Sequence, residues 1–193
     1  MNKLTLTAAF ISITFLSSFG QTSSGDKMSR VPKKISVETG YDYFFKSTYQ
    51  RIPTSAYALV FDYAWQLSGF NGKAASYISV PLGYSSLPSM DTSKFSSSSM
   101  YYYGWTVRHN LASGKKIIPY LGYALMLTNL KEKSVAGSVM GHNTRFEFGV
   151  EYKVGIKNIV FCKIEYGFRR FSERGKKESD SMQNFGLKLG MRF

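Results

Sequence analysis

The sequence is poor in cysteine, histidine and acidic side chains, and each shortage excludes a class of protein. Its one cysteine, Cys162, cannot form an internal disulfide. Its two histidines, His109 and His142, belong to no cluster with metal-ligand spacing, so we expect no metal and no cofactor. Asp and Glu number 12 against 25 Lys and Arg, which gives a formal charge of +13. A chain this basic favours an anionic neighbour.

Long apolar runs are absent after residue 20, which excludes helical membrane spans. The first 20 residues place Lys3 before an apolar stretch, and Ser18 and Gly20 are small residues just before Gln21. This arrangement predicts a signal peptide over residues 1–20, cleaved near Gly20/Gln21, with an N-terminal membrane anchor as the less favoured alternative. Residues 21–33 are polar and aperiodic, and we interpret them as a flexible periplasmic lead-in. Export argues against nucleic acid as the partner of the basic chain.

Aromatic residues and glycine are abundant, and they alternate with other residues in a strand-like pattern. Aromatics make up 16% of the chain, and there are 17 glycines. The last segment, FGLKLGMRF, places five apolar side chains on one face of an extended strand and only glycine and cations on the other. The five are Phe185, Leu187, Leu189, Met191 and Phe193. Similar segments occur at residues 34–46, 56–67, 75–84, 100–109, 116–127, 144–154 and 159–171. Residues 34–193 are therefore predicted to form an eight-stranded antiparallel up-and-down transmembrane β-barrel.

The charged residues decide which face of the predicted barrel meets lipid. A soluble lipocalin-like barrel would have its apolar face inside. In a membrane barrel, charges on the lipid face would cost several kcal/mol, so they are expected inside. The predicted lumen charge network is Glu38, Asp42, Asp62, Arg108, Glu147, Glu151, Lys163, Glu165, Arg169, Lys188 and Arg192. Acids and bases in this set are nearly balanced, and we expect them to plug a narrow lumen.

The predicted connections alternate in length, which is typical of short periplasmic turns and longer outer loops. The short ones are residues 68–73, 110–115 and 155–158; the longer ones are 47–55, 85–99, 128–143 and 172–183. Cations outnumber acids on the side with longer loops. Candidate contacts for lipopolysaccharide phosphates are Arg169, Arg170, Arg174, Lys176 and Lys177. Ordinary loop solubility is the alternative explanation.

The signal peptide, the eight strands and the terminal aromatic resemble the small bacterial outer-membrane β-barrels of OmpA/OmpX-like architecture. The final strand, with Phe193 in last position, resembles that family's C-terminal assembly signal. The resemblance implies insertion by the barrel-assembly machinery into the outer membrane of a Gram-negative bacterium. The stretch SYISVPLGY also resembles the Y-L-x-I-P-L strand of the PorT-like outer-membrane β-barrel domain of Bacteroidetes, with Tyr77, Ile78, Val80, Pro81 and Leu82 matching. That resemblance implies a partner in protein secretion or envelope assembly.

The expected function is a structural or interaction role in the outer membrane rather than catalysis. A lipid A-modifying enzyme is the first alternative, and it would need a polar constellation built around a histidine. His109 is expected beside a short turn and His142 at the edge of a long loop, and neither matches the His-x-Ser pattern of outer-membrane lipid A deacylases. A narrow pore lined by the lumen charges is the second alternative.

Overall fold

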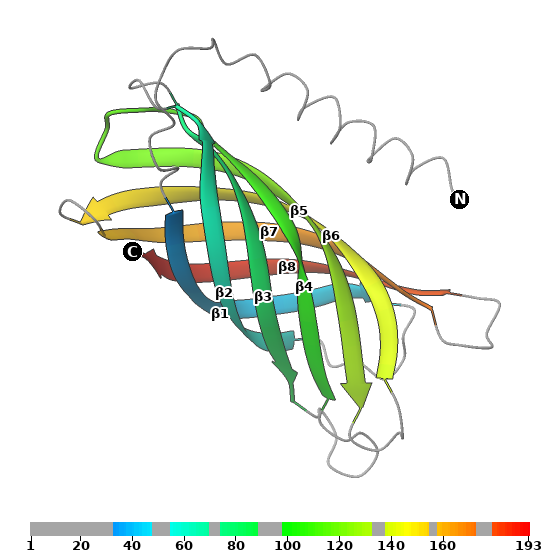
Figure 1. Ribbon diagram of the computed structural model, residues 1–193. Helices are drawn as coiled ribbons and strands as arrows, with labels where there is room; N and C mark the ends of the chain where they lie inside the picture. The colour runs from blue at the N-terminus through cyan, green and yellow to red at the C-terminus, as the bar shows by residue number, and fades with distance from the viewer. Residues whose placement is uncertain are drawn as a thin grey trace, which may run out of the picture. The chain divides into compact units, whose positions relative to one another are not determined.

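The chain folds as a closed barrel of eight antiparallel strands in the computed structural model (Figure 1). The structure describes residues 33–47, 55–69, 74–88, 98–132, 138–154, 158–172 and 179–193. The strands are β1 (Lys33–Ser47), β2 (Ser55–Ser68), β3 (Ser76–Leu87), β4 (Ser98–Asn110), β5 (Ile117–Glu132), β6 (Ser138–Val154), β7 (Asn158–Ser172) and β8 (Ser179–Arg192). The predicted fold class is confirmed. In these ranges no helix is long and apolar enough to span a membrane. The predicted signal peptide and nearly all of the predicted lead-in lie outside the described residues.

The barrel closes because β8 pairs with β1. The N–H of Phe193 donates to the Ile35 carbonyl at 2.9 Å, and the N–H of Ile35 donates to the Phe193 carbonyl at 3.4 Å. The start of β1 and the end of β8 therefore lie at the same end of the barrel (Figure 1). We call this the turn end, because the β2–β3, β4–β5 and β6–β7 connections also lie there. The other four connections lie at the opposite end, which we call the loop end.

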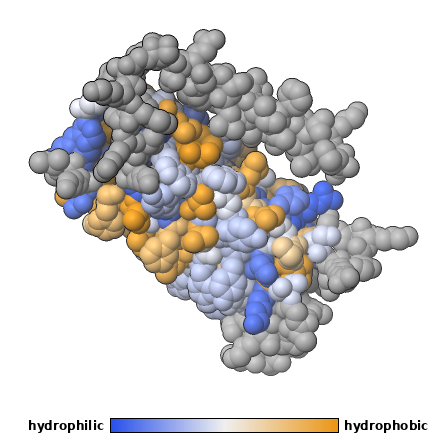
Figure 2. Space-filling model, in the orientation of Figure 1, coloured by the Kyte–Doolittle hydropathy of each residue, from blue (hydrophilic) through white to orange (hydrophobic). Residues whose placement is uncertain are grey.

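Apolar side chains face outward and charged ones face inward, as the alternation predicts. Along β8, Phe185 and Leu187 are 57% and 54% exposed, whereas Lys188 between Leu187 and Leu189 is fully buried. Figure 2 shows hydrophobic side chains spread over the outer surface. The alternative of a soluble barrel with an apolar interior is therefore wrong about which face is inside.

Three of the four predicted long connections are shorter in the structure, because the strands continue past the predicted ends. β5 extends to Glu132 and β6 begins at Ser138, so most of the predicted 128–143 connection is strand. β3 extends to Leu87, and β8 begins at Ser179. The 47–55 connection agrees with the structure. Polar stretches predict loops in a soluble protein, but a polar residue that faces a polar lumen is compatible with a strand.

Three inward-facing glycines make room for aromatic rings on the neighbouring strand. Gly83 is paired with Tyr102, Gly149 with Tyr120 and Gly190 with Phe161. In each pair, a Cβ on the glycine would overlap the ring of its partner. The glycines therefore let large rings lie flat along the barrel wall, as the predicted narrow lumen requires.

Pro81 interrupts the ladder between β3 and β4. Ser79 pairs with Thr106 and Leu82 with Tyr103, but the two positions between them have no paired residues in β4. Proline has no N–H to donate, so a gap in the ladder is expected at this point. This seam is the least continuous of the eight in the described residues.

Candidate functional site in the barrel lumen

The predicted lumen network is assembled from five strands whose alternate residues point inward. β1 contributes Glu38 and Asp42, β4 contributes Arg108, and β6, β7 and β8 contribute the rest of the buried set, while Asp62 lies on a sixth strand, β2. Ten of the eleven predicted residues are buried: Glu38, Asp42, Arg108, Glu147, Glu151, Lys163, Glu165, Arg169, Lys188 and Arg192. Arg145 is also buried among them. The inward positions of these charges follow the period-two alternation of the strands.

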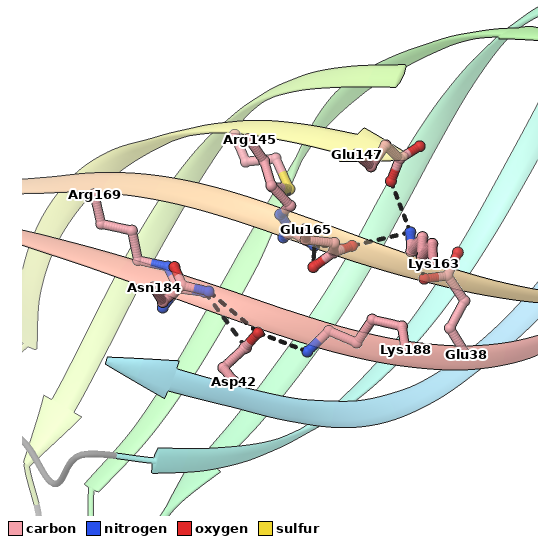
Figure 3. Close-up of polar contacts among 10 residues, drawn as sticks. Glu38, Asp42, Arg145, Glu147, Lys163, Glu165, Arg169, Asn184 and Lys188 are labelled. Carbon is pink, nitrogen blue, oxygen red and sulfur yellow. Dashed lines mark hydrogen bonds and ion pairs between the residues drawn. The ribbon is translucent and has the colours of Figure 1, made fainter. Parts of the chain in front are cut away.

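Lys163 is the centre of the first cluster of ion pairs. Its Nζ lies 2.7 Å from Glu38, 2.8 Å from Glu147 and 3.0 Å from Glu165 (Figure 3). Arg145 Nη1 donates to both oxygens of Glu165, at 2.8 and 2.9 Å. Two cations therefore hold three carboxylates from β1, β6 and β7 in one layer of the lumen.

Asp42 is the centre of the second cluster, nearer the loop end. Its Oδ1 accepts hydrogen bonds from Lys188 Nζ at 2.8 Å and from Asn184 Nδ2 at 3.2 Å (Figure 3). Arg169 Nη2 lies 3.6 Å from Asp42 Oδ2. Because Asp42 comes from β1, while Lys188 and Asn184 come from β8, this cluster also ties the closing seam together.

Glu151 is the centre of the third cluster, at the turn end. Its Oε1 pairs with Arg108 Nη1 at 2.8 Å and with Arg192 Nη1. The guanidinium groups stack on aromatic rings: Arg108 lies 4.9 Å from the Tyr77 centroid and 4.8 Å from that of Tyr120. Such stacking stabilises a cation removed from water.

The loop end of the lumen is closed by an apolar cluster that the sequence analysis missed. We call it the apolar plug; it consists of Phe44, Ala56, Leu87, Met100, Leu130, Phe171 and Met182, none more than 5% exposed. Most of these residues lie in or beside segments that were predicted as loops. Continued alternation was the signal that could have found them, since Leu130 follows Thr128 and Phe171 follows Arg169 on the inward face.

Asp62 faces the lumen but takes no part in the three clusters. It lines an interior cavity of about 20 Å³, together with Glu38, Arg108 and Lys163. Its Oδ1 accepts no hydrogen bond from any residue in the described ranges. A cavity of this size is sufficient for one ordered water molecule.

The two histidines lie on different strands, His109 on β4 and His142 on β6. Ser76 Oγ lies 2.8 Å from Nδ1 of His109, near the turn end of the barrel. In a nucleophile–base pair the hydroxyl bonds Nε2, while Nδ1 is held by a carboxylate, so this arrangement is reversed. His142 lies within β6 rather than at a loop edge. No group of three or more His, Cys, Asp or Glu side chains in the described residues could hold a metal ion.

The remaining predicted site residues lie on the outer surface or outside the described ranges. Phe185, Leu187, Leu189, Met191 and Phe193 all face outward on β8 or directly after it, and their role as an assembly signal stays a prediction. Of the candidate lipopolysaccharide contacts, Arg170 is exposed on β7. Arg174, Lys176 and Lys177 lie outside the described residues. Arg169 is 1% exposed inside the lumen, so we correct its assignment as a surface contact.

The barrel is similar to solved bacterial outer-membrane structures. It superposes on Neisserial surface protein A with a TM-score of 0.57 and 14% identity, covering 83% of this chain and 95% of that chain. The outer-membrane enzyme PagL gives a TM-score of 0.49 and 12% identity, covering 81% and 97%. The N-terminal β-barrel domain of Pseudomonas aeruginosa OprF gives 0.47 and 12%, covering 83% and 97%. No protein-family model and no curated protein sequence matches the chain. The chain therefore has the fold of the outer-membrane β-barrels, and the PorT-like resemblance stays a prediction.

Proposed function

We propose that this protein is an integral outer-membrane β-barrel with a structural or interaction role, located in the outer membrane of a Gram-negative bacterium after cleavage near Gly20/Gln21. One observation carries the proposal. The closed barrel exposes large apolar side chains over its outer surface and buries its charges inside. A surface of this kind is stable when lipid covers it, and a closed barrel leaves no strand edge unpaired in the bilayer.

The packed interior supports a structural role over a channel. The apolar plug fills the loop end, and the ion-pair clusters around Lys163 and Asp42 fill the middle. An eight-stranded barrel has an interior just wide enough for its own side chains. A conducting path would have to displace buried ion pairs, which costs several kcal/mol.

An interaction role would use the two ends of the barrel and the final strand. The barrel-assembly machinery would recognise the apolar face of β8 during insertion. At the loop end, Arg170 together with Arg174, Lys176 and Lys177 would bind lipopolysaccharide phosphates as charge-assisted pairs. The PorT-like resemblance of Ser76–Tyr84 supports a secretion or envelope-assembly protein as partner.

The first test is migration on SDS gels before and after boiling. The full chain refolded in detergent should migrate faster when unboiled, as a closed detergent-resistant barrel does. The variant Leu187→Arg places a charge on the outer face and should destabilise insertion into vesicles by about 2–4 kcal/mol if that face meets the bilayer midplane. A wild-type chain that stays soluble without detergent and shows no gel shift would contradict the proposal.

Two further measurements test the plug and the lipopolysaccharide contacts. In planar bilayers the wild-type protein should show no stepwise conductance, and steady unitary currents would favour the narrow pore. Neutralising Arg170, Arg174, Lys176 and Lys177 together should reduce co-purification of lipopolysaccharide. Neutralising the turn-end pair Lys115 and Lys116 instead is the control. Equal co-purification in all three proteins would leave the cations as solubility residues only.

A further inference from the structure

The turn end of the lumen contains an open vestibule of about 210 Å³. The side chains that line it include Lys34, Gln66, Tyr77, Asn110, Glu151 and Lys153. Unlike the loop end, which the apolar plug closes, this end presents polar and charged groups to a ligand that enters from outside the barrel. The vestibule is larger than the interior cavity of about 20 Å³ that lies deeper in the lumen.

Positive charge is in excess around the vestibule. Lys34 interacts electrostatically with Arg108, Lys153 and Arg192, and with the single carboxylate of Glu151. Four cations therefore lie around Glu151, which is already paired with both arginines, and a further acid without an ion-pair partner in the described residues, Asp62, lines the inner cavity beside those arginines. Glu147 also acts on Arg108, but it is held by Lys163 at 2.8 Å. Cations brought together away from water are costly unless an anion joins them.

The two arginines behind the vestibule line the smaller inner cavity and not the vestibule itself, and they carry unpartnered hydrogen-bond donors. Nε and Nη2 of Arg108, and Nε of Arg192, have no hydrogen-bond partner in the described residues, although both side chains are more than nine-tenths buried. Both arginines line the inner cavity of about 20 Å³, and Tyr77 lines that cavity and the vestibule alike. Unpartnered buried donors cost about 1–3 kcal/mol each.

Tyr77 links the lysine of the vestibule to the arginines below it. Lys34 Nζ lies 3.4 Å from the Tyr77 hydroxyl and 5.1 Å from the ring centroid. Arg108 and Arg192 lie 4.9 and 6.0 Å from the same ring. One aromatic side chain is therefore surrounded by three cations, and an anion on its vestibule side would lie within the field of all of them.

We infer that the vestibule binds a phosphate group presented from the turn end of the barrel. A phosphate carries close to two negative charges and several strong acceptor oxygens, which suits this excess of cations better than a single carboxylate does. Lys34 and Lys153 would bind its oxygens directly, and Arg108 and Arg192 would contribute long-range attraction. The group is either free phosphate or the headgroup of a phospholipid in the adjacent leaflet. This inference goes beyond the proposed function, because it gives the plugged barrel a ligand.

The test is calorimetric titration of inorganic phosphate into the full chain, refolded in a phosphate-free nonionic detergent at constant ionic strength. Saturable binding is expected for the wild type, with affinity at least tenfold weaker in Lys34→Gln/Lys153→Gln. The control Lys115→Gln/Lys131→Gln removes the same charge from exposed positions and should bind as the wild type does. Equal weakening in both pairs, or no saturable binding in the wild type, would overturn the inference.

A second variant and a second medium complete the phosphate titration. Lys153→Gln alone, a milder change of a partly exposed residue, replaces the double variant if the latter gives no gel shift, and it should still weaken binding several-fold. Repeating the titration in phosphatidylcholine vesicles identifies the source of the phosphate: unchanged binding indicates free phosphate, and competition by the lipid indicates a headgroup. A barrel that shows the gel shift but binds no phosphate would refute this inference and leave the proposed function intact.

Discussion

The two halves of one lumen are filled by opposite chemistries. At the loop end, seven apolar side chains pack against one another and need no specific partner. In the middle and at the turn end, buried charges depend on partners from other strands, as Lys163 does on three carboxylates. Removing a side chain from the apolar plug leaves a cavity, whereas removing one from the network leaves unpaired charges. The same barrel wall therefore accepts either an apolar or a charged interior, but the two regions should differ in how well they tolerate substitutions.

The largest effect is expected from the substitution Lys163→Met. It leaves Glu38, Glu147 and part of the Glu165 charge without their cation in a buried layer, and should lower the free energy of unfolding by about 3–5 kcal/mol. Urea unfolding in lipid vesicles, followed by tryptophan fluorescence, measures the loss. The exposed control Lys115→Gln should stay within about 0.5 kcal/mol of the wild type. A loss below about 1 kcal/mol for Lys163→Met would mean that apolar packing can replace this part of the network, as it often can replace buried ion pairs.

The apolar plug should tolerate truncation better than the network does. Leu130→Ala should cost about 2–4 kcal/mol, because it removes fully buried methyl groups and leaves a cavity. Leu127→Ala, on the outward face of the same strand, is the matched control and should cost less in the same urea assay. If both leucines cost the same, the cluster at the loop end contributes no more than the lipid-facing surface.

Substitutions at Gly83 and Tyr102 test how closely these two residues approach each other inside the lumen. Gly83→Ala should cost on the order of 1–3 kcal/mol, because its Cβ would overlap the Tyr102 ring. The double variant Gly83→Ala/Tyr102→Leu removes the overlap. Its loss of stability in urea should therefore be smaller than the sum of the losses of Gly83→Ala and Tyr102→Leu. Simple addition of the two losses would argue against a close approach.

The smallest effect is expected where the two regions meet. Arg169 of the network lies 5.2 Å from the Phe44 ring of the plug. A double-mutant cycle of Phe44→Leu and Arg169→Met should give a coupling energy of about 0.5–2 kcal/mol. The pair Lys163→Met and Leu130→Ala shares no ion-pair or cluster partner in the described part of the chain, so the two losses should add within about 0.5 kcal/mol. Coupling in both cycles would mean that the lumen responds as one unit.

The sequence predicts the barrel and its inner face well, because both follow from alternation. Phe185 and Lys188 were assigned to opposite faces, and the structure agrees. Partners were not predictable: nothing in the order of residues shows that Lys163 meets Glu38, which lies 125 positions earlier and on a strand that is not a neighbour of β7. Met182 and Leu130 were not predicted for a different reason: each is an isolated apolar residue in a polar stretch, and such a stretch predicts a loop. The vestibule depends on Tyr77, and nothing in the order of residues indicates that three cations meet this ring.

The order of the strands has a consequence for how the barrel is built. Seven of the eight strand pairings join strands that follow each other along the chain. Each of these can form as a hairpin with little loss of loop-closure entropy. The eighth seam joins Ile35 to Phe193 and spans the whole barrel, and contacts of such long sequence separation form late and slowly. Until β8 reaches β1, both edges stay open to pairing with another chain. Asp42 on β1 and Lys188 on β8 come together only when these two strands pair, so their ion pair forms in the step that closes the barrel.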